Sequence, residues 1–380
     1  MRKFAVLMLL AALASPLWAK DEPIAEKVTV LQLEARVAAA RGQADADAAQ
    51  QLSGLELTER LSAVRFARMN DGLPGEKARQ ALLIVADSAT FLDPPAEISA
   101  SSLPDAAATR QMLTAIVNYV NTTVRQLPNL IATRNTTSFE DRPQEDVQEP
   151  TGIVSYSYLP LHVVAKSSVQ VTYRDRQEVA DEKTLKHGPK IGGLATSGEF
   201  GPILSMVVGD ALKGKITWSR WEQGADSKEA VFHYTVPGDK SHYNVQFCCV
   251  SDGFNSDGTA NVRVFSERVG YHGDIAFDPA AGSILRITME AELPSGDLVS
   301  RAGIAVEYSP VEIGGMTYIC PAKSASVLRA NIAHHTGAYS RSNYKGAAKT
   351  FLNDVVFDQY RRFGTESRIV AGDSGESNKP

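Results

Sequence analysis

The stretch GYHGDIAFDPAAGSILRITMEAEL, which runs from Gly270 to Leu293, alternates apolar and polar residues on either side of a short turn. Successive side chains of a β-strand point to opposite faces of a sheet, so the pattern predicts two strands, each with one apolar face. Between them, Pro279 and Gly282 stand where a tight loop accepts these residues. The stretch therefore predicts an antiparallel hairpin.

The same alternation continues through most of residues 153–330. The turns predict a register in which Ile275 lies opposite Leu285, and Ile287 lies opposite Ile304. A run of consecutive hairpins this long curls so that one face stays dry. We therefore expect a long, curled antiparallel meander in the form of a half-open barrel.

Other signals divide this β domain further. Gly238-Asp239 predicts a tight hairpin that sets Tyr234 opposite Tyr243, and Gly314-Gly315 predicts another. Residues 199–213 break the alternation and predict an inserted helix beside or over the sheet.

The beginning of the chain has the features of an export signal. Residues 1–19 combine a basic start, a short apolar run and small residues, with cleavage expected near Ala19. We expect a periplasmic or secreted protein, and no later stretch is apolar and long enough to predict a transmembrane segment in the mature chain.

Residues 20–135 predict a helical bundle, because apolar residues recur there at helical spacing. Thr29 and Gln32, for example, have the spacing of a capping box at the start of a helix. Residues 136–152 are polar and rich in acids and proline, which predicts a linker.

The last part of the chain divides into three segments. Residues 331–345 predict a flexible tract, and residues 365–380 a disordered tail. Between them, residues 346–364 carry Phe351, Leu352, Val355 and Val356 in a pattern that predicts a C-terminal amphipathic helix. The fold class expected for the whole chain is α+β.

Three cysteines are present: Cys248, Cys249 and Cys320. An oxidising compartment favours one disulfide and leaves one thiol over. Alternation places Cys249 on the apolar face of its strand, so we predict a Cys249–Cys320 disulfide, with Cys248–Cys320 as the alternative.

Composition excludes one class of partner. The formal net charge is −5 and charged residues make up 22% of the chain, so there is no broad basic surface to attract nucleic acid. With nucleic acid excluded, the expected partner is an apolar or amphipathic small molecule, or a protein of the cell envelope.

Several motifs carry a resemblance to known families. The runs QALLIVADSATFLDPP, FGPILSMVVGDALKGKITWSRWEQG and FLNDVVFDQY resemble motifs of a family of uncharacterised exported bacterial proteins, which implies no particular activity. Between residues 270 and 323, the pattern of turns and alternation is similar to that of the LolA/LolB-like lipoprotein carriers. That resemblance implies a half-open β-barrel, closed on one side by helices, with an apolar hollow for acyl chains.

Motifs for catalysis are not found in the sequence. Its seven histidines form neither H-E-x-x-H nor H-x-H, and G-x-S-x-G does not occur. His233 and His242 are expected near each other across the Gly238 turn, but without a nearby carboxylate they do not predict a metal site. We predict no catalytic residues, no metal and no cofactor.

An apolar hollow between the curled sheet and its helices is the expected functional feature. The alternation places Trp218 on the core side of its strand and Trp221 on the opposite side. The predicted lining of the hollow consists of Trp218, Tyr271, Phe277, Leu285, Ile287, Met289 and Ile304. The sequence thus predicts a binding or carrier protein for an apolar or amphipathic, lipid-like ligand. A non-catalytic envelope scaffold and an unrecognised hydrolase are the alternatives.

Overall fold

The computed structural model describes residues 25–95, 103–149, 152–180, 194, 197–224, 227–254, 260–294, 297–331 and 347–363. The predicted export signal, nearly all of the 331–345 tract and the 365–380 tail lie outside these residues.

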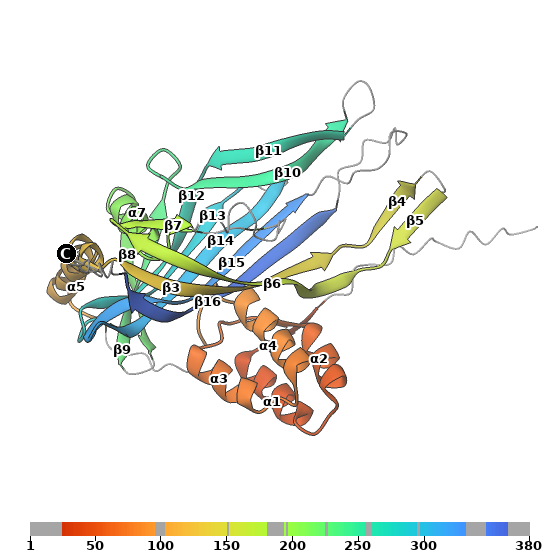
Figure 1. The fold of residues 1–380 in the computed structure, drawn as a ribbon, viewed down its shortest axis with the longest axis horizontal. Helices are drawn as coiled ribbons and strands as arrows, with labels where there is room; N and C mark the ends of the chain where they lie inside the picture. Colours follow the sequence, from red (N-terminus) through yellow and green to blue (C-terminus); the bar gives the residue numbers. More distant parts are fainter. Residues whose placement is uncertain are drawn as a thin grey trace, which may run out of the picture.

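A large antiparallel sheet forms the body of the structure (Figure 1). Its ten described strands follow the order β7-β6-β3-β16-β15-β14-β13-β12-β9-β8, and the two end strands do not pair with each other. The strands are β3 (Leu130–Arg142), β6 (Leu159–Arg174), β7 (Gln177–Ala180), β8 (Lys215–Gln223), β9 (Lys228–Val236), β12 (Gly270–Asp278), β13 (Ser283–Glu292), β14 (Val299–Ile313), β15 (Met316–Asn331) and β16 (Ala348–Arg362). The sheet is therefore open, and the fold class is α+β.

Three smaller strand pairs accompany the sheet. They are the parallel pair β1 (Glu26–Val28) and β2 (Leu55–Leu57), the hairpin β4 (Glu145–Glu149) and β5 (Gly152–Tyr156), and the hairpin β10 (Asn244–Phe254) and β11 (Ala260–Arg268). Figure 1 shows the β4–β5 hairpin extending from one end of the sheet.

The helices lie on both faces of the sheet. Figure 1 shows α1 to α4 grouped on one side, with α5 and α7 at one end of the sheet. Their bounds are α1 (Val30–Ala40), α2 (Asp45–Ser53), α3 (Ala63–Asp71), α4 (Glu76–Ser88), α5 (Ala106–Asn118) and α7 (Pro202–Ala211); a π-helical turn (Tyr119–Thr123) and a 3₁₀ turn (Val124–Gln126) follow α5. Helix α7 lies within the predicted 199–213 segment.

Different elements pack against the two faces of the sheet. On the inner face, which includes Tyr271 and Ile287, side chains of α5 and α7 join the sheet's largest apolar cluster. At the other end of this face, Phe247 and Phe265 of the β10–β11 hairpin pack against β14, β15 and β16. On the outer face, Leu83 of α4 and its neighbours pack against Phe139, Val327 and Leu352.

Several local predictions are confirmed. Thr29 and Gln32 form the capping box of α1, with both reciprocal hydrogen bonds present. The hairpin between β14 and β15 turns at Gly314 and Gly315, whose φ angles are 63° and 80°. Such positive φ angles at both central residues fit a type I′ turn, which suits glycine.

The predicted register is displaced by two residues, although the hairpins themselves are present. Ile275 pairs with Ile287 instead of Leu285, and Ile287 pairs with Val306 instead of Ile304. A shift of two keeps Ile275 and Ile287 on their predicted face, so the apolar face is still continuous there.

The predicted C-terminal helix is wrong, because residues 348–362 form β16 in the middle of the sheet, between β3 and β15. Residues Phe351 to Val355 are all buried. A strand that is covered on both faces loses its polar alternation, and over a short run it cannot be told from a helix by periodicity.

The predicted domain boundaries also differ from the structure. Residues 136–152 are not a simple linker, since they contain the end of β3 and all of β4. The helical domain predicted over 20–135 is divided: α1 to α4 share one apolar cluster, whereas α5 packs with the sheet and β3 begins at Leu130. The tight hairpin predicted at Gly238-Asp239 is also wrong, because β9 pairs with β8 and β12, and β10 pairs with β11.

Candidate functional site

The predicted ligand-lining residues mostly belong to a packed core. Five of the seven are at most 5% exposed and lie in one apolar cluster with α5 and α7: Tyr271, Phe277, Ile287, Met289 and Ile304. Trp218 packs against this cluster. Leu285 does not belong to it, because a bulge pairs Phe277 with Ile284, which occupies the core position.

A second bulge, in β8, places the two tryptophans on the same face of the sheet. Trp218 pairs with Phe232 and Trp221 pairs with Ala230, with one extra residue between them on β8. Both indoles therefore lie on the inner face, and their ring centroids are 4.9 Å apart. The prediction that they point to opposite faces is wrong.

A strip of short polar side chains occupies the middle of the inner face. It consists of Ser138, Ser324, Ser326 and Asn353, and we call it the inner polar strip. Ser326, Asn353 and Ser138 are direct neighbours across β15, β16 and β3. All four are buried, and Ser326 is only 2% exposed. Among the described residues, the Ser326 hydroxyl has no hydrogen-bond partner. Buried polar atoms without partners are uncommon in packed cores.

A buried ion pair borders this strip. The Arg134 guanidinium contacts the Glu199 carboxylate at 3.0 Å, and Glu199 is fully buried. The Ser324 hydroxyl donates to the same carboxylate at 3.4 Å. Burial, and then the charge of Glu199, raises the pKa of Glu178 nearby. The inner face thus combines polar and ionic groups with the apolar cluster on the adjoining strands.

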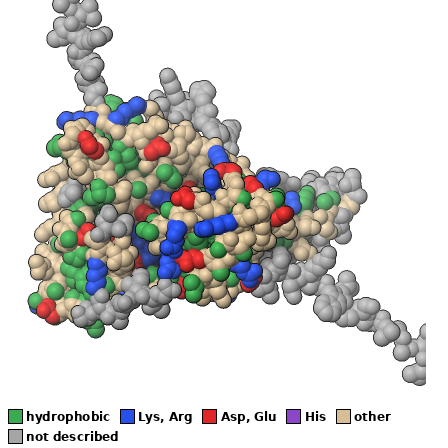
Figure 2. Space-filling view, turned by 90° about the horizontal axis from the view of Figure 1, so that it is seen from below, with side chains coloured by type: hydrophobic (Ala, Val, Ile, Leu, Met, Phe, Trp, Pro, Cys, Tyr) green, Lys and Arg blue, Asp and Glu red, His purple; other side chains and the backbone are tan. Residues whose placement is uncertain are grey.

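The outer face holds a larger ionic network. Figure 2, viewed from below, shows Lys, Arg, Asp and Glu side chains around a hollow beside the α1–α4 group. At the centre of the network, the nearly buried Glu222 contacts Arg60, Arg286 at 3.0 Å and Arg220 at 2.7 Å. Arg60 precedes α3, so the network joins the N-terminal segment to the sheet.

The charge balance of this network determines the protonation of Glu222. Burial by itself raises the pKa of Glu222, but Arg286, Arg60 and Arg220 outweigh it and hold that pKa at about 2. Glu222 is therefore a carboxylate at neutral pH.

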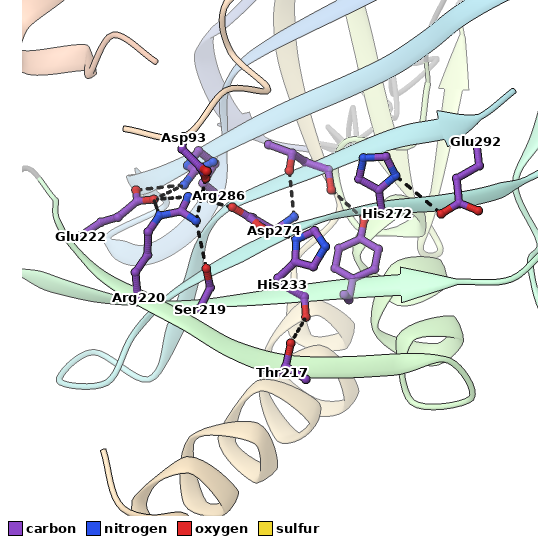
Figure 3. A network of polar contacts seen from close by, with 12 residues as sticks. Asp93, Thr217, Ser219, Arg220, Glu222, His233, His272, Asp274, Arg286 and Glu292 are labelled. Carbon is purple, nitrogen blue, oxygen red and sulfur yellow. Dashed lines mark hydrogen bonds and ion pairs between the residues drawn. The ribbon is translucent and has the colours of Figure 1, made fainter. Parts of the chain in front are cut away.

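The network continues along the outer face to two histidines. Figure 3 shows Arg220 between Glu222 and Asp274, with His233 beside Asp274 and His272 near Glu292. Arg220 contacts Asp274 at 2.8 Å, and the Nδ1 atom of His233 lies 2.9 Å from the same carboxylate. The ring centroids of His233 and His272 are 6.1 Å apart. The predicted partner His242 instead contacts Asp210 at 2.6 Å.

A separate buried triad fixes α4 to the sheet. Lys323 on β15 contacts Asp87 on α4 at 2.6 Å and Asp354 on β16 at 3.1 Å. Burial raises the pKa of Asp87 to about 8; Lys323 opposes this effect and Asp354 reinforces it. Two carboxyl groups thus face one ammonium group in this triad.

Cys320 is buried and is a free cysteine, so the structure does not contain the predicted disulfide. Leu328 lies eight residues farther along β15, which is about 26 Å at the rise of a strand. Leu328 shares an apolar cluster with Phe247, the residue before Cys248. The side chains of Cys248 and Cys249 lie outside the described residues, but a disulfide needs Cα atoms within about 7 Å.

The described residues contain no group of three or more His, Cys, Asp or Glu residues arranged to hold a metal ion. None of their helices is both long and apolar enough to cross a membrane.

Sequence reasoning missed both polar groups for the same physical reason. The inner polar strip and the outer network join residues from strands that are distant in sequence, so no local motif contains them. One signal was available: the alternating apolar face of β15 changes to serine at Ser324 and Ser326.

No protein-family model matches the chain, and neither a curated protein nor a solved structure matches it. The resemblances to uncharacterised exported proteins and to the LolA/LolB-like carriers therefore remain predictions.

Proposed function

We propose that this chain is a binding or carrier protein that holds an amphipathic ligand on the inner face of its sheet. The observation that supports this proposal is the inner polar strip beside the apolar cluster. Ligand sites are mostly apolar, with a few placed polar groups that fix the orientation of the ligand.

The register gives the order of these surfaces. Met289 pairs with Ile304, which pairs with Ser326, then Asn353, then Ser138. One row across five strands thus changes from apolar to polar. An amphipathic molecule that lies along this row would place its chain toward Met289 and Ile304 and its polar group toward Ser326 and Asn353.

The ion pair beside the row suggests the chemistry of the polar group. Arg134 is 14% exposed in its side chain, and its Glu199 partner is fully buried. The guanidinium of Arg134 and the hydroxyl groups of the inner polar strip favour a ligand whose polar group is a carboxylate, a phosphate or another strong acceptor. The ligand class supported best is therefore a fatty acid or a related acyl compound with an anionic or strongly polar group.

The first test measures the ligand directly. Lipids extracted from the purified protein are identified by mass spectrometry, and the delipidated protein is titrated with a fluorescent fatty acid. We expect saturable uptake with about one ligand per chain. A protein that carries no lipid and takes up no probe would contradict the proposal.

The second test locates the ligand. Ser326→Phe fills the strip and should abolish uptake, whereas Ser168→Phe, at an exposed position on β6, should leave it unchanged. Because a phenylalanine at a buried position can impair folding, Ser326→Ala serves as a milder variant that removes only the hydroxyl. It should weaken uptake of the fatty acid while thermal unfolding shows that the sheet is intact; unchanged uptake by a folded Ser326→Ala variant places the ligand elsewhere.

A further inference from the structure

Two histidines on the outer face lie where one metal ion could reach both. His233 is on β9 and His272 is on the neighbouring β12, and His272 pairs directly with Thr235, two residues from His233. Both side chains point to the outer face, and they are 46% and 41% exposed. The two imidazoles are thus diagonal neighbours with access to solvent.

A carboxylate determines which ring nitrogen of His233 is available. The Nδ1 atom of His233 lies 2.9 Å from Asp274, and the Nδ1 atom of His272 lies 3.8 Å from Glu292. A carboxylate can only accept a hydrogen bond, so the Nδ1 atom of His233 carries the proton. In the neutral ring, the lone pair then resides on Nε2. Histidines that bind metals are commonly oriented in this way by a carboxylate.

The orientation of His233 is itself held by a chain of contacts. Arg220 donates to Asp274 at 2.8 Å, and the backbone amide of Asp274 donates to the Thr288 hydroxyl at 2.9 Å. Figure 3 shows this chain from Arg220 through Asp274 to His233. Asp274 is thus fixed on both sides before any ion arrives.

The separation of the rings fits a shared ion. Each Nε2 atom stands about 2.1 Å from a bound metal, which places two ring centroids about 5 Å apart on a tetrahedral ion and about 6 Å apart at a wider angle. The observed separation is 6.1 Å. Rotation of two half-exposed rings covers the remaining difference.

We propose that His233 and His272 form a two-histidine site for a divalent transition-metal ion such as Ni²⁺, Zn²⁺ or Cu²⁺, with water as the remaining ligands. Imidazole nitrogen is a preferred donor for these ions. The site is independent of the ligand proposed for the inner face, since it lies on the opposite face of the sheet.

The test is a calorimetric titration of the untagged protein with Ni²⁺. The background carries His334→Gln and His335→Gln, because those adjacent histidines could compete. We expect one Ni²⁺ per chain, with the affinity reduced at least tenfold by His233→Ala and by His272→Ala. His242→Ala, which removes an exposed histidine paired to Asp210, should leave the affinity unchanged.

A positioning variant separates this site from adventitious binding. Asp274→Asn removes the carboxylate that orients His233 and should weaken Ni²⁺ binding by about 10- to 100-fold. Thermal unfolding of each variant without metal checks that the sheet is intact. Absence of binding, or binding of equal strength in the His233→Ala/His272→Ala double variant, would overturn the proposal.

Discussion

The hydroxyl of Tyr234 on β9 donates a hydrogen bond to the backbone carbonyl of Thr288 on β13 over 2.6 Å, across the intervening strand β12. Gly273 makes this reach possible, because it pairs with Tyr234 and has no side chain. A Cβ atom at Gly273 would stand 1.9 Å from the Thr288 carbonyl oxygen and 3.0 Å from the Tyr234 hydroxyl. A side chain from a third strand thus satisfies a backbone group of the β12–β13 ladder.

The first prediction concerns this close approach. Gly273→Ala should destabilise the protein by about 3 kcal/mol or more, because the methyl group forces backbone to move and breaks the buried hydrogen bond. Urea unfolding followed by circular dichroism measures the change. As the matched control, Gly209→Ala in α7 adds a methyl group with nothing within 4 Å. It should stabilise the helix by about 0.5–1 kcal/mol; equal effects of the two variants would refute the argument.

The second prediction concerns the carboxylate at the centre of the outer network. Glu222→Gln leaves Arg60, Arg220 and Arg286 without their shared counter-charge, and should cost about 3–5 kcal/mol in unfolding free energy. Glu290→Gln is the matched control. Its carboxylate pairs with the partly exposed Arg301, so it should cost less than about 1 kcal/mol.

Glu222 also gives the network a pH dependence. Its pKa in the folded protein is about 2, below the value of 4.5 expected when unfolded. The contribution to stability is therefore present above about pH 4.5 and is lost as the pH falls toward 2. The unfolding free energy of the wild type should decline over this range, and that of Glu222→Gln should decline less.

How far the sequence predicts this fold depends on whether a pattern is local. The capping box of α1 and the turn at Gly314-Gly315 are set by neighbouring residues, and both are confirmed. The strand β16 could not be recognised, because its burial comes from helix α4 on one side and from the inner-face clusters on the other. Its partners are distant in sequence, so its own residues carry no alternation.

Bulges explain the errors in the predicted site. Strict alternation assigns Leu285 to the core and separates Trp218 from Trp221, but one extra residue in β13 and one in β8 reverse these assignments. A bulge has no fixed sequence signature. The juxtaposition of His233 with Asp274 was equally hidden, since it depends on β9 pairing with β12 and not with β10.

The third prediction concerns Asp87, whose pKa is raised from 3.8 to about 8 by burial and by Asp354. Because the folded protein binds the proton of Asp87 more tightly than the unfolded chain does, this group's contribution to the unfolding free energy is complete below about pH 3.8. The contribution is lost progressively as the pH rises through 8. Asp87→Asn mimics the protonated group, so its unfolding free energy should fall less between pH 5 and pH 9 than that of the wild type. Asp71→Asn, at an exposed position, should follow the wild-type curve; a parallel curve for Asp87→Asn would contradict the assignment.

The fourth prediction concerns Cys320, which is buried in the cluster that includes Phe200 and Phe357. Burial raises the pKa of its thiol to about 12, so almost no thiolate exists at pH 8 and the thiol is shielded from reagents. We expect iodoacetamide to leave Cys320 unmodified in the native protein and to alkylate it fully in urea, as shown by peptide mass spectrometry without reductant. If Cys320 stayed unmodified in urea until a reductant was added, it would be in a disulfide, and the pairing with Cys248 or Cys249 predicted from the sequence would replace the free thiol.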